Sequence, residues 1–420
     1  GGAEIGGLLF DYAKPLLAAA GIKGVTDIVL INDSSFNAFV NGRSIYINTG
    51  TIMASGSPNE VIGVLAHEIG HLAGGHQERL RQKLESAGRM ATIAGLVGMG
   101  AAVAGSASGN GDAGKAGAGI AAGAQEMARR SILAYQRTEE ITADRSAVVY
   151  LDKTGQSARG MLITFQRFQT SLALSGTKVD PYKISHPLPR ERIANLEDLA
   201  QKSPNFGKAD SPALQARHDL ARAKVAAYSG NINTVRRLFR DRPDSIGLKY
   251  GEAISAYLQG SSKDALNKFD ALVKQMPQNG YVHEIRGEIL LKANRPADAA
   301  KAFRTALKLD PGKGATIQVG LGQSLLLAGD TDGAIRELGE ALRRDKTNAV
   351  GYEYLARAYA QTGREPDALL ATAQMYYYNG AIKDARIFAA RAQQGFKKGS
   401  PGWLRAGDII NSGAKPAKKS

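Results

Sequence analysis

The chain has 420 residues, enough for two or three domains that each bury a core of their own. It contains no cysteine, which excludes a disulfide scaffold and a thiolate metal site and suits an oxidising compartment. Its formal net charge of +15 favours anionic partners such as a phospholipid surface. No recognition motif with interleaved aromatic residues accompanies this charge, so we expect no nucleic acid partner.

The first fifty residues predict a helix followed by a small sheet. Apolar residues at helical spacing indicate a helix over 4–20. The β-branched segment 25–31 indicates a strand, and two further strands are predicted over 36–40 and 44–48. Asn41-Gly42 between them is a dipeptide that favours tight hairpin turns, so we expect these two strands to pair.

The pattern H-E-x-x-H follows, formed by His67, Glu68 and His71 in a segment that predicts one helix from about Pro58 to beyond Arg81. Residues four apart lie one turn apart on the same face of a helix, so the two imidazoles can hold one metal ion. Glu68 projects close to that ion without being a ligand. It can therefore take a proton from a water molecule at the metal, which is the arrangement of zinc peptidases.

Two histidines do not complete a zinc site, so the chain must supply a third ligand. The metzincin pattern needs a histidine six residues after His71, but that residue is Gln77, and His76 misses the position by one. Glu140 and Asp144 lie four apart on one face of a predicted helix and fit better. We predict that Glu140 is the third ligand of one zinc ion and that Asp144 hydrogen-bonds a zinc histidine.

Residues 90–124 separate these motifs and consist almost entirely of Gly, Ala and aliphatic residues, with a polar break over 106–115. Neither half reaches the roughly 20 apolar residues that a membrane span needs. Three interpretations stay open: a shallow hairpin that touches a membrane, a plug over the active site, and a mobile insertion. Helices are predicted again over 127–153 and 161–174, followed by a loop over 175–189.

The chain changes to helical repeats after about residue 204. Small residues recur at a close-packing position, at intervals of 34, 35 and 34 residues: Ala265, Ala299, Ala334 and Ala368. The intervening turns carry Gly260, Gly329 and Gly363, and Asn294 fills that position once. A period of about 34 is that of tetratricopeptide repeats, helix pairs that bury their apolar faces by stacking on their neighbours. We predict such a solenoid over 205–410, opening on an irregular pair over 213–240 and followed by a basic tail over 411–420.

The metal motifs also carry a family resemblance. His67 to His71, taken with Glu140-Ile-Thr-Ala-Asp144, resembles the gluzincin peptidases grouped with the HtpX-type heat-shock membrane proteases and the CAAX prenyl endopeptidases. The segment 36–50 resembles the active-site edge strand of that family and the strand after it, and 186–192 resembles its downstream His-Pro motif. The match covers roughly residues 4–200. Together with the repeats it is most similar to the BepA-like periplasmic proteases.

The resemblance implies an α+β, predominantly α fold: a gluzincin-type metallopeptidase domain over 1–200, with 90–124 as an insertion, and an all-α repeat solenoid. It implies an endopeptidase that degrades misassembled envelope proteins in the periplasm without ATP. We expect its signal peptide to have been removed. It gives the edge strand, represented by Asn37, Ala38 and Phe39, the role of pairing with the substrate backbone.

The same resemblance implies roles for two residues of the His-Pro motif. His186 either hydrogen-bonds the oxyanion that develops during hydrolysis or occupies the open zinc position as a reversible fourth ligand. The second role would hold the enzyme silent until its loop moves. Arg192 either stabilises the same oxyanion or anchors that loop.

A second hypothesis makes the repeats the primary functional element. The protein would then be a scaffold or chaperone that docks on an outer-membrane assembly complex, with latent proteolysis. The two hypotheses differ in whether Glu68 is needed for biological function.

Overall fold

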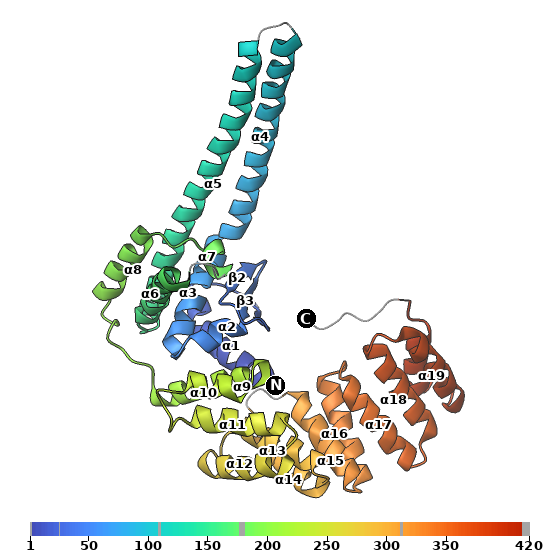
Figure 1. Cartoon of the computed structure of the whole chain (residues 1–420). Helices are drawn as coiled ribbons and strands as arrows, with labels where there is room; N and C mark the ends of the chain where they lie inside the picture. The colour runs from blue at the N-terminus through green and yellow to red at the C-terminus, as the bar shows by residue number, and fades with distance from the viewer. Residues whose placement is uncertain (1, 25, 108–110, 176–180, 311–313, 414–420) are drawn as a thin grey trace. The chain divides into compact units, whose positions relative to one another are not determined.

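The computed structural model describes residues 2–24, 26–107, 111–175, 181–310 and 314–413. The chain divides into two compact units, Gly1–Leu248 and Lys249–Ser420 (Figure 1). The α+β, predominantly helical fold that the sequence predicts is confirmed: the described strands all lie in the first unit, and the second is helical. Among the described residues, no helix combines the length and the apolarity that a bilayer crossing requires.

The first unit places its secondary structure elements in this order: α1 (Gly2–Ala19), β1 (Ile28–Ile31), β2 (Ala38–Asn41), β3 (Ser44–Asn48), α2 (Thr49–Ala54), α3 (Pro58–Gly74), α4 (His76–Ala107), α5 (Gly111–Lys153), α6 (Arg159–Ser175), α7 (Pro181–Ser185), α8 (Arg190–Lys202), α9 (Pro212–Ser229) and α10 (Ile232–Leu238). The last helix of this region, α11 (Ile246–Leu258), leads into the second unit.

The sheet has the strand order β1-β3-β2, so β2 is an edge strand. β1 runs parallel to β3, and β2 pairs antiparallel with β3 through a turn at Gly42 and Arg43, where Gly42 has a φ of 63°. The predicted turn at Asn41-Gly42 was one residue too early, because Asn41 belongs to β2 and pairs with Ser44. Asn48 N–H donates to the carbonyl oxygen of Asn37, so the backbone polar groups of residues 37, 39 and 41 face β3. Those of Ala38 and Val40 therefore face away from the sheet.

The helix α3 carries the H-E-x-x-H pattern and has well-defined ends. Ser57 accepts from Glu60 N–H while the Glu60 carboxylate accepts from Ser57 N–H, a capping box that satisfies the first turn. The predicted extension beyond Arg81 is wrong, because Gly75 adopts the left-handed conformation (φ 65°) and ends the helix at Gly74. A new helix, α4, then begins at His76 in a different direction.

The segment 90–124 is helical wherever the structure describes it. It forms the end of α4 and the beginning of α5, and the two helices pack against each other as a long antiparallel hairpin that projects from the body of the unit (Figure 1). The prediction that helix resumes at 127 was therefore too late, since α5 begins at Gly111. Alanine is the best helix former, so the many alanines favour helix here. The glycines do not mark close contacts between the two helices, because a Cβ atom at Gly88, Gly100, Gly119 or Gly123 would meet nothing within 4 Å.

The helices α9 and α10, expected as the leading pair of the repeats, belong to the first unit. α9 contacts α1, α2 and α3. His218 on α9 is fully buried: it accepts a hydrogen bond from the Tyr12 hydroxyl (2.8 Å) and donates to the carbonyl oxygen of Ser55 (2.7 Å). Lys224 and Glu4 form a buried ion pair at 3.0 Å. These polar contacts fix α9 to the core of the first unit.

The second unit begins within α11 and continues with these helices: α12 (Ser262–Gln275), α13 (Gly280–Lys292), α14 (Pro296–Leu309), α15 (Ala315–Leu327), α16 (Thr331–Arg344), α17 (Ala349–Gln361), α18 (Glu365–Tyr378), α19 (Ile382–Gly395) and α20 (Pro401–Ile410). Ala265, Ala299 and Ala334 are fully buried, whereas Ala368 is half-buried. Asn294 has a φ of 58°, the conformation of the glycines at the equivalent turns.

Candidate metal centre

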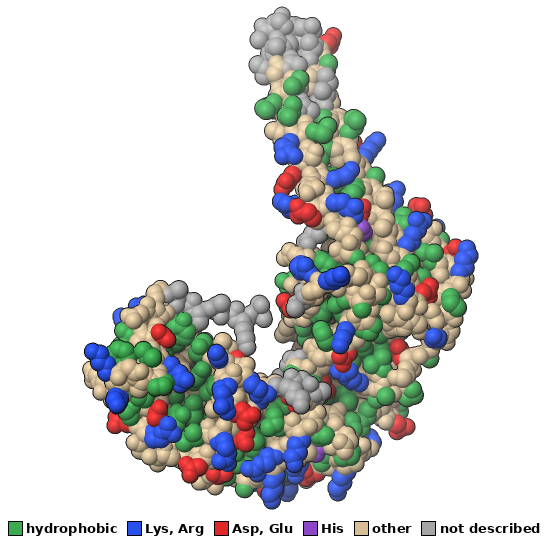
Figure 2. All heavy atoms as spheres, turned by 180° about the vertical axis from the view of Figure 1, so that it is seen from behind, with side chains coloured by type: hydrophobic (Ala, Val, Ile, Leu, Met, Phe, Trp, Pro, Cys, Tyr) green, Lys and Arg blue, Asp and Glu red, His purple; other side chains and the backbone are tan. Residues whose placement is uncertain are grey.

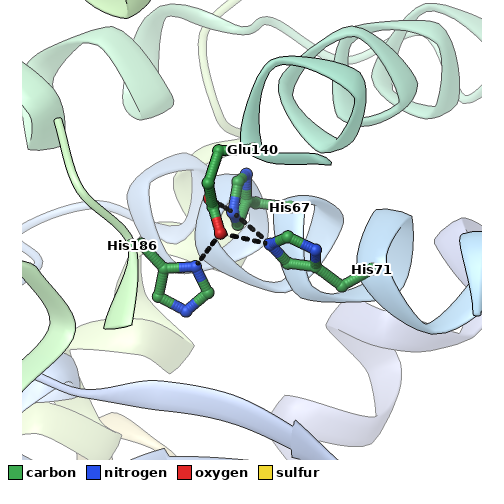
Figure 3. Close-up of side chains that lie close together, drawn as sticks. All are labelled: His67, His71, Glu140 and His186. Carbon is green, nitrogen blue, oxygen red and sulfur yellow. Dashed lines mark hydrogen bonds and ion pairs between the residues drawn. The ribbon is translucent and has the colours of Figure 1, made fainter. Parts of the chain in front are cut away.

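Three segments of the first unit bring four side chains together. His67 and His71 lie one turn apart on α3, Glu140 reaches them from α5, and His186 approaches from the loop between α7 and α8 (Figure 3). One ligand atom from each of the four side chains lies within 4.8 Å of the others. The cluster therefore has the compactness that a single metal ion requires.

The approach of α5 to α3 depends on Gly70, which lies between the two histidines. A Cβ atom at this position would come within 3.0 Å of the Ala143 carbonyl oxygen. Because only glycine leaves this space free, the backbones of α3 and α5 can touch. Glu140 is one turn before Asp144 on the same face of α5, so both carboxylates reach α3.

Nitrogen and oxygen atoms that carry lone pairs lie close together within the cluster. Nε2 of His67 lies 2.9 Å from Oε2 of Glu140, and Nε2 of His71 lies 3.0 Å from Oε1 of the same carboxylate. The two Nε2 atoms are themselves 3.0 Å apart. This arrangement is repulsive unless protons or a cation lie among these atoms.

The predicted partner of the zinc histidines, Asp144, contacts His67. Its Oδ1 atom lies 2.9 Å from Nδ1 of His67, so this nitrogen carries the proton and Nε2 presents its lone pair to the cluster. Burial raises the pKa of Asp144, but the Arg192 guanidinium and His67 lower it by more, so the pKa is held below its ordinary value. An ionised Asp144 thus fixes the tautomer that binds a metal.

Two buried carboxylate oxygens fit a cation better than they fit the surrounding protein. Oε2 of Glu140 and Oε1 of Glu68 are buried and have no hydrogen-bond partner. Each lies near an imidazole nitrogen, at 2.9 Å from His67 and 3.1 Å from His186, and Oε2 of Glu140 also lies 3.2 Å from the Arg192 guanidinium. None of these contacts has hydrogen-bonding geometry. Because unpaired buried acceptors are costly, and because the donor set is imidazole and carboxylate, these residues fit a divalent metal ion.

Glu68 lies beside the cluster and is almost fully buried. Burial raises its pKa, but His186 and the other two imidazoles lower it by more, so the pKa lies below its ordinary value. The same carboxylates act on His186, whose pKa is lowered by burial and raised by Glu68 and Glu140 to about 10. A positive charge on His186 compensates the charges of Glu68 and Glu140.

The position of Arg192 distinguishes between its two expected roles, stabilising the oxyanion and anchoring the loop. It is buried and does not line the cleft beside the cluster. Its guanidinium donates to both oxygens of Asp144, at 2.6 and 3.0 Å, and to the carbonyl oxygens of His186 (3.3 Å) and Pro187 (2.9 Å). The geometry favours loop anchoring over oxyanion stabilisation.

The edge strand β2 borders the cleft, which is lined by Phe39, Val40, Glu68, His71, His76, Leu80, Tyr135, Gln136, Glu139, Glu140, Ser185 and His186. Of the three residues expected to pair with substrate, Ala38 turns its backbone away from β3, whereas Asn37 and Phe39 turn theirs towards it. Sequence reasoning missed Val40, which faces the same way as Ala38. The backbone polar groups of successive residues in an edge strand point in alternate directions, so the β2–β3 register identifies Val40 as well as Ala38.

Sequence reasoning also missed the neighbours of His71. His76, set aside because its spacing does not fit a ligand, lies with its Nδ1 atom 2.8 Å from Nδ1 of His71, and Glu139 contacts its other nitrogen at 2.5 Å. Burial, followed by the charges of His71 and Arg79, lowers the pKa of His76 to about 4. The acidic pair Glu139-Glu140 was the available clue.

We predict that Arg192→Ala lowers the free energy of unfolding of the first unit by about 3–5 kcal/mol, because it leaves Asp144 as an uncompensated buried charge. Urea denaturation monitored by circular dichroism measures this change. The control is Arg190→Ala, since Arg190 is exposed at the start of the same helix and should change stability by no more than about 0.5 kcal/mol. Equal effects of the two substitutions would contradict an anchoring role.

Comparisons with known proteins agree with this geometry. Residues 9–200 match the model of Peptidase family M48, and residues 250–314, 289–350 and 319–385 match that of a tetratricopeptide repeat. The chain is 23% identical over 398 residues to the beta-barrel assembly-enhancing protease of Escherichia coli (strain K12), covering 91% of this chain and 77% of that protein. A putative beta-barrel assembly-enhancing protease of Vibrio cholerae serotype O1 is 30% identical over 282 residues, 63% of this chain and 54% of that protein.

One similar solved structure is that of YrrB, which is described as a TPR protein with an unusual peptide-binding site. The alignment covers 42% of this chain and 92% of YrrB, at 16% sequence identity and a TM-score of 0.34. The repeat matches begin at residue 250, close to the start of the second unit at Lys249. The chain therefore carries a metallopeptidase domain of family M48 followed by tetratricopeptide repeats.

Proposed function

We propose that this protein is an ATP-independent zinc endopeptidase that cleaves unfolded polypeptides. The observation that carries the proposal is the convergence of two imidazoles and a carboxylate beside a second, buried carboxylate without a hydrogen-bond partner. His67, His71 and Glu140 would hold the ion. Two histidines and a glutamate are a ligand set of catalytic zinc sites, which keep a position open for water or substrate.

Zinc, when bound, polarises the substrate carbonyl and lowers the pKa of a coordinated water molecule. Glu68, as the general base, would take a proton from that water and deliver it to the leaving amine. Its buried position beside His71 and His186 suits this role, because the surrounding imidazoles keep it ionised. Asp144, held by Arg192, would keep His67 in the tautomer that binds the ion.

The edge strand supports a polypeptide substrate. Ala38 and Val40 turn their backbone polar groups away from β3, and Val40 lines the cleft. The carbonyl oxygen of Ala38 lies 3.4 Å from Nε2 of His186, so a substrate in extended conformation would pair with this edge in place of His186. Main-chain pairing tolerates many side chains. An enzyme with this device would recognise exposed, unfolded segments more than a specific sequence.

We infer a role in envelope protein quality control, in the periplasm of a Gram-negative cell. Two observations support it: the relatives are called beta-barrel assembly-enhancing proteases, and the chain lacks cysteine. The tetratricopeptide repeats would dock the substrate or an outer-membrane assembly complex, because stacked helix pairs form extended binding surfaces. We propose the domain limits 1–200, 205–410 and 411–420 for the peptidase, the repeats and the tail, with α9 and α10 as a leading pair that packs as part of the first unit.

We propose further that His186 is a reversible fourth ligand. Its Nδ1 atom lies 2.9 Å from Oε1 of Glu140, inside the cluster, where it would compete with substrate for the open position. The loop that carries it is fixed at both ends, by the packing of Tyr182 on Phe36 and by Arg192. Activation would require at least one of these contacts to change.

The hairpin of α4 and α5 supports a peripheral membrane contact. Met90, Ile93, Val97 and Met127 are between 63% and 73% exposed, and basic side chains lie among apolar ones along the hairpin (Figure 2). The first three lie on one face of α4, at helical spacing. An apolar face next to positive charge suits the surface of an anionic bilayer.

The scaffold alternative is favoured by the size of the second unit and does not require catalysis. The catalytic base separates the two functions. If Glu68→Gln restored the phenotype of a deletion strain as well as the parent does, the scaffold function would be the biological one.

We predict that Glu68→Gln reduces casein cleavage by at least about 100-fold, because a general base contributes 10²–10⁴-fold. Metal content, measured by atomic absorption, should stay unchanged because Glu68 is not a ligand. Glu78→Gln serves as the control, since Glu78 is exposed on α4. Parental cleavage by Glu68→Gln would refute the mechanism.

We predict that His186→Ala raises basal casein cleavage and speeds metal loss to a chelator, because it removes a competing ligand. If His186 instead stabilises the oxyanion, cleavage should fall while metal binding stays constant. His283→Ala, which removes a histidine of the second unit, is the control. A His186→Ala protein with parental activity and metal affinity would rule out gating.

We predict that the double substitution Ile93→Glu and Val97→Glu abolishes co-sedimentation with vesicles that contain anionic lipid. The reason is that both substitutions place a charge on the apolar face of α4. Gln82→Glu with Thr92→Glu adds the same charge to α4 without removing apolar side chains, and should reduce binding less. Equal binding by the parent and the apolar-face variant would contradict the membrane contact.

A further inference from the structure

His71 differs from His67 in what lies behind it. His67 donates its Nδ1–H directly to a carboxylate, that of Asp144. His71 faces a second histidine instead: its Nδ1 atom lies 2.8 Å from Nδ1 of His76. Nε2 of His76 in turn lies 2.5 Å from Oε2 of Glu139. The chain of contacts therefore ends on a carboxylate here too, but one imidazole further out.

The proton positions on His71 and His76 follow from the groups at the two ends of this series of contacts, the metal cluster and the Glu139 carboxylate. Nε2 of His71 faces the cluster and must present a lone pair to bind an ion, so its Nδ1 carries the proton. The Nδ1–H group of His71 donates a hydrogen bond to Nδ1 of His76, so His76 must carry its own proton on Nε2. The Glu139 carboxylate accepts a hydrogen bond from this Nε2–H group, since an ionised carboxylate is an acceptor only. With Nε2 of His71 free to bind an ion, this set of tautomers satisfies every contact of the relay.

The backbone around His76 is arranged to allow these contacts. Gly75 has a φ of 65°, which ends α3 and lets the chain turn so that His76, the first residue of α4, folds back onto the end of α3. A Cβ atom on Gly74 would lie 2.3 Å from the His76 ring. Two consecutive glycines thus provide the turn and the space for the imidazole, which is buried.

Glu139, at the end of this series of contacts, lies on α5, the helix that also supplies the predicted ligand Glu140. Glu139 and Glu140 are neighbours on α5, about 100° apart around the helix axis. Glu140 therefore points to the cluster, while Glu139 points to His76 and also lies 3.5 Å from Arg79. The side chains of His76 and Glu139 are only 6% and 14% exposed, so little water competes for these hydrogen bonds.

We propose that Glu139 and His76 form a relay of hydrogen bonds that orients His71 and fixes the tautomer in which it binds the metal. Both are positioning residues, because they act through His71 and not on the substrate. The relay rests on the proposed metal-binding function of the cluster. It gives His71, through two hydrogen bonds, the support that Asp144 gives His67 through one.

The test measures metal binding and not activity. Parent, His76→Phe, Glu139→Gln and the control His283→Phe are titrated with Co²⁺ and Zn²⁺ against a chromophoric chelator. His76→Phe keeps an aromatic ring but leaves the Nδ1–H of His71 without an acceptor, so we expect affinity to fall by about 10–100-fold. Glu139→Gln keeps an acceptor without the charge, so its loss should be smaller. His283→Phe should match the parent.

A second measurement reports the tautomer directly. With ¹⁵N-labelled histidine, long-range ¹H–¹⁵N correlation of the zinc-loaded parent should show His71 protonated at Nδ1. His76→Phe should shift the His71 signals and broaden them, a change that loss of packing elsewhere would not produce. If His76→Phe fails to fold, as judged by circular dichroism, Glu139→Gln decides the matter.

Parental affinity and an unchanged His71 spectrum in a folded variant would overturn the relay. If the parent binds metal but neither the parent nor His186→Ala cleaves casein, the proposed peptidase function is refuted, and the relay is supported or rejected by affinity alone. A parent that binds neither ion would overturn both.

Discussion

The contact between α3 and α5 is the constraint on which the first unit depends. Two histidines one turn apart on α3 hold nothing unless a third group reaches them, and Glu140 reaches them because the helices touch at Gly70 and Ala143. The same contact brings Asp144 to His67 and Glu139 to His76. A Cβ atom at position 70 would press on Ala143 and Ser146 of α5, at 3.0 to 3.4 Å, and so would act on the contact that all three pairs share.

Burial of these charged groups costs free energy, so the groups that lack a partner indicate where the site binds something. Charged groups removed from water must be paired, and most are: Asp144 by Arg192 and His67, and Glu139 by His76. What remains are two carboxylate oxygens, of Glu68 and Glu140, that face imidazole nitrogens without forming hydrogen bonds. A folded chain tolerates such groups when an ion or a substrate completes the site. The imperfect pairing therefore locates the chemistry within an otherwise compensated network.

The insertion between the metal motifs adds a helical hairpin without disturbing this network. The base of the hairpin contributes Leu80 and Tyr135 to the cleft, and its outer part carries exposed aliphatic side chains. The tetratricopeptide repeats form a separate unit with a core of their own, built from small residues that let helices pack closely. Catalysis and docking are thus assigned to units that could vary independently.

The sequence by itself determined every feature that depends on local spacing. Histidines four apart on a helix, an acidic pair four apart on another and a 34-residue repeat are periodic patterns, and the geometry of helices converts them into structure. The tertiary structure alone decided which groups meet across long separations. It turned Arg192 towards Asp144, placed α9 on the first unit and set His76 behind His71. These outcomes depend on packing between distant segments and on the need to pair buried charge, which no local pattern records.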